Sequence, residues 1–72
     1  MFEEIQKLKL EERIKIYRSL IEISLSKDFT NTKKYKIAKL EFSFEDVIII
    51  TRYAILVYGN YLPSFAAIQF CN

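Results

Sequence analysis

The stretch "SFEDVIIITRYAILVYG", residues 43–59, decides the fold, because both of its ends carry the signals of a helix. Ser43 is followed three residues later by Asp46 and then by an apolar run, which is the pattern of a helix capping box. The acidic residues of this first turn also lie where the helix dipole favours negative charge. Gly59 stands where a glycine in the left-handed conformation commonly ends a helix. We therefore predict a helix over residues 44–58.

A strand is the alternative for the same stretch. Its Val-Ile-Ile-Ile-Thr content is typical of strands, and a strand over 47–58 would turn at Gly59 and Asn60 into residues 61–70. A strand of that length would be unusually long, however, and Pro63 would confine the following strand to a sheet edge. The helix is therefore the preferred prediction.

Residues 3–26 predict another helix, because they contain no Gly, Pro or Asn and repeat apolar residues at helical spacing. One apolar stripe comprises Leu10, Ile14, Tyr17, Ile21 and Leu25, and a second beside it comprises Ile16, Leu20 and Ile23. Together the stripes are wider than one contact requires, so we expect two neighbours, or one neighbour and a partner chain. Phe2 and Ile5 do not continue the first stripe, which allows a bend near Lys9.

The segment that joins these two helices permits two interpretations. Residues 28–32, "DFTNT", favour a loop, because Asp, Thr and Asn side chains compete for backbone hydrogen bonds. After them, an alternation of apolar and polar residues favours a strand, with the apolar positions at Ala38, Leu40, Phe42 and Phe44. A short helix over 33–41 fits nearly as well.

These elements favour a mainly α fold in a single domain, residues 1–72. It would be a small helical bundle of the long N-terminal helix, the buried helix 44–58 and a short C-terminal helix, which Ser64 caps and which ends at Phe70. The alternative is an α+β fold, in which the N-terminal helix packs on a small antiparallel sheet.

Composition indicates how such a small chain is stabilised. Cys71 is the only cysteine and there is no histidine, so neither an internal disulfide nor a structural zinc site can form. Hydrophobic residues make up 51% of the chain, including six Phe and five Tyr. A single core in a chain this short cannot bury the apolar surface of so many hydrophobic residues. We therefore expect a homo-oligomer or a protein partner that covers one face.

Catalysis is not expected. Without histidine, a general base at neutral pH would have to be a carboxylate or lysine with a shifted pKa. The acidic residues come as sequence neighbours, which do not face each other on a helix, and one glycine cannot make a phosphate-binding loop. We expect neither a cofactor nor a metal.

The start of the chain and its unpaired cysteine favour the cytoplasm, since "MFEEIQK" lacks the basic and apolar regions of a secretory signal. The range 47–71 contains only one charge, Arg52, and would be long enough to anchor the protein in a membrane. Its polar residues and the helix end at Gly59 argue against that anchor.

Nucleic-acid binding is the alternative function. The basic segment 27–39 offers cations for phosphates and one ring for stacking, at Lys33, Lys34, Tyr35, Lys36 and Lys39. A helix-turn-helix is not supported, because the helix that would enter the DNA groove begins with two acidic residues and continues as an apolar run.

Binding of a protein partner is the preferred function. If 44–58 is helical, Glu45, Ile49, Arg52 and Leu56 form one narrow strip that faces water. Arg52 is then either a solvated surface residue or an interface arginine beside Tyr53. Apolar helix faces would make the contact, and the partner-binding residues we expect are Tyr17, Ile21, Leu25, Arg52, Tyr53 and Leu56.

The stretch "KLKLEERIKIYRSLIEISL" resembles the N-terminal helix of addiction-module antitoxins at Leu8, Glu11, Glu12, Arg13 and Leu20. Ser24 and Leu25 are one residue out of step with that pattern, the Ser-Pro expected before the acids is absent, and nothing after residue 26 matches. The resemblance implies an inhibitor or antitoxin-like factor that acts on a protein.

Overall fold

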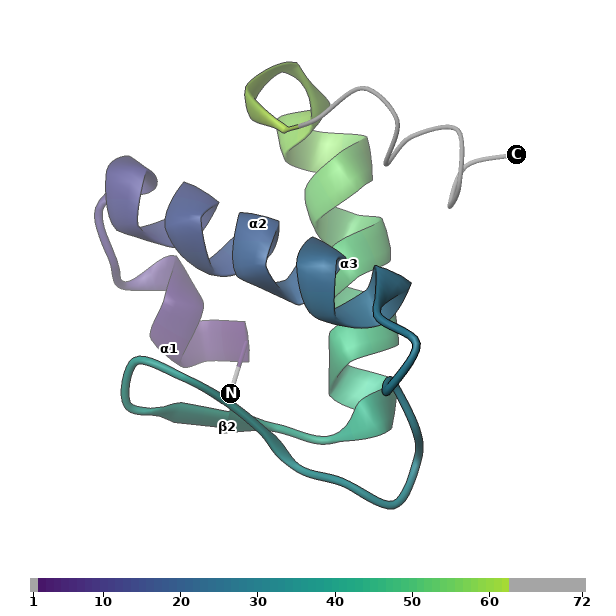
Figure 1. Ribbon diagram of the computed structural model, residues 1–72. Coiled ribbons are helices and arrows are strands. Elements are labelled where there is room, and N and C mark those ends of the chain that lie inside the picture. Colours follow the sequence, from purple (N-terminus) through teal and green to yellow (C-terminus); the bar gives the residue numbers. More distant parts are fainter. Residues whose placement is uncertain (1, 63–72) are drawn as a thin grey trace.

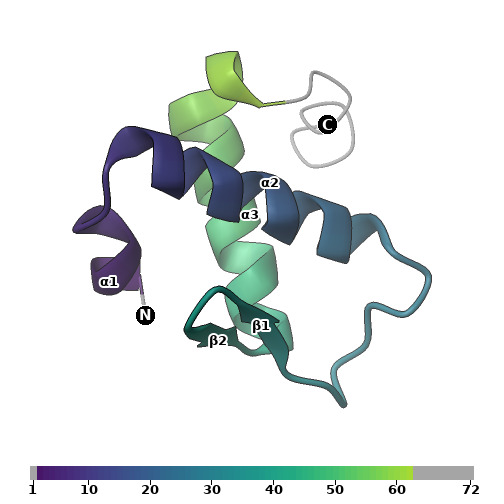
Figure 2. The same cartoon turned by 60° about the vertical axis from the view of Figure 1, so that its left-hand side comes forward.

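A computed structural model describes residues 2–62. The chain forms a short helix α1 (Phe2–Gln6), a long helix α2 (Leu10–Leu25), strands β1 (Tyr35–Ile37) and β2 (Leu40–Phe42), helix α3 (Phe44–Tyr58) and a 3-10 turn η1 (Gly59–Tyr61). Helix α2 crosses α3 steeply, and α1 folds back beside the start of α2 and the hairpin (Figures 1 and 2). The mainly helical class is confirmed, and the small antiparallel sheet of the α+β alternative is also present.

Helix α3 occupies the predicted range, so the strand over 47–58 is wrong. The capping box is formed: Ser43 Oγ accepts a hydrogen bond from the Asp46 amide at 3.1 Å, and the Asp46 carboxylate accepts one from the Ser43 amide at 3.0 Å. Two of the otherwise unsatisfied amides at the helix start are thereby satisfied.

The predicted left-handed stop at Gly59 is wrong. Gly59 is right-handed, with φ −54° and ψ −32°, and the chain tightens there into η1. The Leu62 amide donates to the Gly59 carbonyl at 3.2 Å, which ends the turn without a left-handed residue. A Cβ at this position would meet no atom within 4 Å, so the fold does not require glycine here.

The N-terminal helix is not continuous over 3–26. It breaks at Lys9, which is extended with φ −66° and ψ 155°, in agreement with a bend at that residue. The break lets α1 turn back toward the core, where Ile5 is completely buried. Burial of that side chain compensates for the lost helical hydrogen bonds.

The connector is a β-hairpin, so the helix over 33–41 is wrong, and the strand alternation holds only for part of its range. Tyr35 pairs with Phe42 and Ile37 with Leu40, which leaves Ala38 and Lys39 as a two-residue turn. Ala38 has φ 55°, and no other non-glycine residue of the described chain has a positive φ. Two-residue hairpins need such a conformation, and glycine is the usual residue there.

The core lies where α2, α3, α1 and the hairpin meet. Its largest fully buried side chains are Tyr17, Phe42, Ile5, Leu20, Ile21, Val47 and Thr51. The second apolar stripe of α2 therefore packs inward together with part of the first. The predicted C-terminal helix from Ser64 to Phe70 lies outside the described residues.

Candidate protein-binding surface

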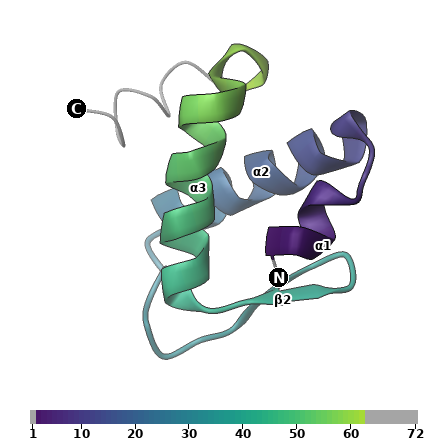
Figure 3. The same cartoon turned by 180° about the vertical axis from the view of Figure 1, so that it is seen from behind.

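Within residues 2–62, the three most exposed large hydrophobic side chains lie on the outer side of α3. Ile49 is 65% exposed, Leu56 76% and Val57 55%. The helix is apolar on nearly every side, but α2 and the hairpin cover only the side that carries Val47, Ile50, Thr51, Ala54 and Ile55. Viewed from behind, α3 lies in front of α2, and no described helix or strand covers it (Figure 3).

We name this surface the α3 ridge and define it as Glu45, Ile49, Arg52 and Leu56. All four residues are exposed, as helical spacing predicted, but Val57 is exposed as well, so the exposed side of α3 is wider than the predicted strip. Glu45 and Arg52 are two helical turns apart, about 10 Å along the axis, and the two apolar residues alternate with them. The ridge thus presents one acid, one base and two aliphatic side chains.

A shallow apolar hollow adjoins the ridge. Phe2, Asp46, Ile49, Ile50 and Tyr53 line it, and its volume is about 270 Å³. The Phe2 ring meets the Tyr53 ring edge to face at 4.6 Å between centroids, so α1 forms one wall. Four of its five lining residues are apolar or aromatic, and the Asp46 carboxylate already accepts a hydrogen bond from the Ser43 amide, so the hollow suits an apolar group.

Tyr53 is held in place by a polar cluster that joins three helices. Gln6 Nε2 donates to Tyr53 Oη at 3.2 Å, and Arg13 Nη1 donates to Gln6 Oε1 at 3.2 Å and to Tyr58 Oη at 2.8 Å. The Arg13 guanidinium also lies 5.4 Å from the centroid of the Tyr58 ring. Tyr53 is therefore a rigid, half-buried residue beside the ridge.

Tyr17 and Ile21, which were expected to contact a partner, belong to the core. Tyr17 is 0% exposed and Ile21 1% exposed. Burial raises the pKa of Tyr17 to about 12, the hydroxyls of Tyr58 and Tyr53 act in the same direction, and Arg13 opposes them. Within residues 2–62 the Tyr17 hydroxyl has no hydrogen-bond partner.

The remaining expected partner residues divide between two helices. Arg52, Tyr53 and Leu56 come together on α3, whereas Leu25, 39% exposed, is the last residue of α2. The structure therefore gathers three of the six expected residues on one helix. It adds Ile49, which helical spacing had already placed on the same strip.

The basic segment does not form a single cluster. The four lysines expected to contact phosphates are all exposed, but Lys33 and Lys34 precede the hairpin, Lys36 faces Glu41 across it, and Lys39 is in its turn. Tyr35 is not a free stacking surface. Its hydroxyl accepts from the Thr30 amide at 2.8 Å and donates to the Thr30 carbonyl at 3.0 Å, and its ring contacts Phe29.

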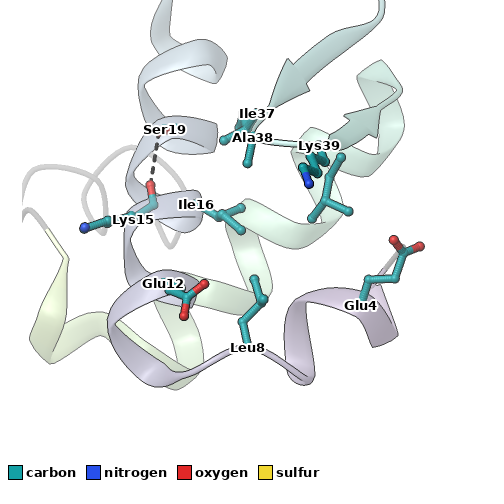
Figure 4. A pocket seen from close by; sticks show the side chains of 10 residues that line it. Glu4, Leu8, Glu12, Lys15, Ile16, Ser19, Ile37, Ala38 and Lys39 are labelled. Carbon is teal, nitrogen blue, oxygen red and sulfur yellow. Dashed lines mark hydrogen bonds between the residues drawn. The ribbon is translucent and has the colours of Figure 1, made fainter.

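A second concave site lies between α1, α2 and the hairpin turn, and we name it the groove (Figure 4). Its volume is about 550 Å³, and its floor is apolar, made by Leu8, Ile16, Ile37 and Leu40. In Figure 4, Glu4 and Glu12 flank Leu8 on the helical side, Lys39 lies on the hairpin side, and the Lys15 chain extends away. No sequence pattern indicated this site, because it forms where α1 and α2 meet a hairpin turn that lies far from them in the chain.

Sites of other kinds are not evident in the part of the chain that the structure describes. No three His, Cys, Asp or Glu residues within 2–62 lie close enough together to hold a metal ion. Within the same range, no helix has the length and apolar character needed to span a bilayer. Comparison with protein-family models, curated proteins and solved structures found no match to this chain.

Proposed function

We propose that this protein is a non-catalytic binding factor that docks onto a protein through the α3 ridge and the adjoining hollow. The observation that carries the proposal is the exposure of Ile49 and Leu56, at 65% and 76%, on a helix whose other side is fully packed. Covering a large aliphatic side chain stabilises a contact by about 1.5–3 kcal/mol when burial is complete.

The arrangement matches the anatomy of protein interfaces. Arginine and tyrosine are enriched among the residues that contribute most to binding, and they act best at the centre of a patch that excludes water. Arg52 lies between Ile49 and Leu56, and Tyr53 is prepositioned by Gln6 and Phe2. A partner side chain that enters the hollow would meet a surface already ordered, which lowers the entropic cost of binding.

Site-specific photocrosslinking tests the proposal in the cells from which the gene comes. A benzophenone amino acid replaces Leu56 in one variant and Glu22, an exposed residue of α2, in a matched control. We expect a discrete protein adduct from position 56 and none from position 22. Equal adducts from both positions, or none from 56 while the protein is folded, would contradict the proposal.

Two substitutions then distinguish loss of binding at the ridge from loss of folding. Arg52→Leu leaves the free energy of unfolding within about 0.5 kcal/mol of the wild type, because Arg52 is exposed and outside the core. Leu56→Asp places a charge in the ridge, and we expect it to remove the adduct formed by a crosslinker at Ile49. Persistence of that adduct in folded Leu56→Asp protein would show that the ridge is not the binding surface.

A further inference from the structure

We propose that the α3 ridge of one copy of this protein docks into the groove of a second copy. The inference rests on the proposed function and names the partner of the same surface. Ridge and groove share no residue, so each copy offers both halves of the contact.

The shapes of the two surfaces correspond. The ridge is a convex helical strip with two exposed aliphatic side chains seven residues apart, Ile49 and Leu56. The groove is an open concavity of about 550 Å³ with four aliphatic side chains on its floor. Laying an apolar helix strip into an apolar groove is a recurrent mode of recognition.

The charges of the two surfaces also correspond. The ridge carries one base and one acid, Arg52 and Glu45, about 10 Å apart along the helix. On its helical side the groove has two acids, Glu4 and Glu12, and also Lys15, whose side chain extends away from the groove (Figure 4). On its hairpin side it has the ammonium of Lys39. In the orientation that we propose, Arg52 lies toward Glu12 and Glu45 lies toward Lys39, so that each charge faces its opposite. Such complementarity fixes the partner and the direction of docking more than it adds affinity.

The groove fits a ligand of uniform charge less well. Two acids and two lysines line the same groove, so a purely anionic or cationic ligand would meet repulsion from some of them. A helix with alternating apolar, basic and acidic positions avoids that repulsion. The chain carries this pattern on its own α3.

Charge reversal with mixing tests the contact. Arg52→Glu and Glu12→Arg are purified separately and studied by analytical ultracentrifugation with a reductant, so that no disulfide forms through Cys71. We expect the wild type to associate reversibly and each variant alone to dissociate about tenfold or more readily. An equimolar mixture should associate as the wild type does, because the new acid at position 52 of one variant meets the new base at position 12 of the other.

Glu22→Arg is the matched control, since it makes the same charge change at an exposed position of α2 outside the groove. Its association should equal that of the wild type. A wild type that stays monomeric at every concentration, variants that associate normally, or a mixture that fails to recover would each overturn the inference.

The two proposals fail separately. A monomeric wild type whose position 56 still crosslinks to a different protein refutes self-docking and leaves the ridge as a binding surface. An adduct made of two copies of this chain, lost in Glu12→Arg but not in Glu22→Arg, supports both.

Discussion

Thr51→Val should stabilise the protein, although it alters a completely buried residue. Thr51 is 0% exposed on the inner side of α3, and its hydroxyl has no hydrogen-bond partner within residues 2–62. A buried hydroxyl that loses water without gaining a partner costs about 1–3 kcal/mol. Valine has almost the same shape and replaces that oxygen with a methyl group.

The expected gain follows from three contributions. Removal of the unsatisfied hydroxyl contributes about 1–3 kcal/mol, and the new methyl group about 0.8 kcal/mol. The slightly larger methyl group is accommodated imperfectly in a packed core, which opposes part of this gain. Helix propensity changes little, since Thr and Val rank together. We expect a net gain of about 1–2 kcal/mol.

Urea unfolding followed by circular dichroism measures the effect, and thermal unfolding should show a rise of about 4–8 °C in Tm for each kcal/mol. Thr51→Ser is the matched control: it keeps the hydroxyl, removes the buried methyl group and should destabilise by about 1 kcal/mol. If Thr51→Val were no more stable than the wild type, the hydroxyl would have a partner in the folded state, and the reasoning would be refuted.

Three further changes probe other parts of the fold. Ala38→Gly should stabilise by about 0.5–1 kcal/mol in urea unfolding, because φ is 55° at Ala38 and the strain relieved exceeds the added entropy of the unfolded chain; a loss of stability would show that the turn is unstrained. Ser43→Ala removes an acceptor from the capping box and should cost about 1 kcal/mol, and unchanged stability would deny the cap its role. The Tyr17 pKa is about 12 when folded and 10.0 as its ordinary value, so the hydroxyl stays neutral longer in the folded state. The contribution of the neutral Tyr17 hydroxyl to the free energy of unfolding is therefore complete below pH 10 and is lost as the pH rises toward 12. Tyr17→Phe should make the free energy of unfolding fall less steeply over this pH range. An equally steep fall in the variant would contradict the assignment to Tyr17.

The sequence alone determined the features that depend on residues close together in the chain, above all helix α3 and its exposed side. The capping box and the apolar run predict α3 from Phe44 to Tyr58, because those signals act within a single turn or along one helix face. The same helical spacing identified the ridge, since exposure of Glu45, Ile49, Arg52 and Leu56 follows from one-sided coverage of the helix. The break at Lys9 was visible only as an interrupted stripe.

Tertiary packing decided the rest. Spacing on α2 could not tell which of two apolar stripes would be covered, and both Tyr17 and Ile21 were buried by neighbours distant in the sequence. The hairpin competed with a helix because its strands are only three residues long, and burial of Phe42 against the helices favours the paired form. The groove exists only where α1, α2 and the hairpin turn meet. A single sequence records which surfaces are apolar, whereas the assembled helices and strands determine which of those surfaces face each other and which remain exposed.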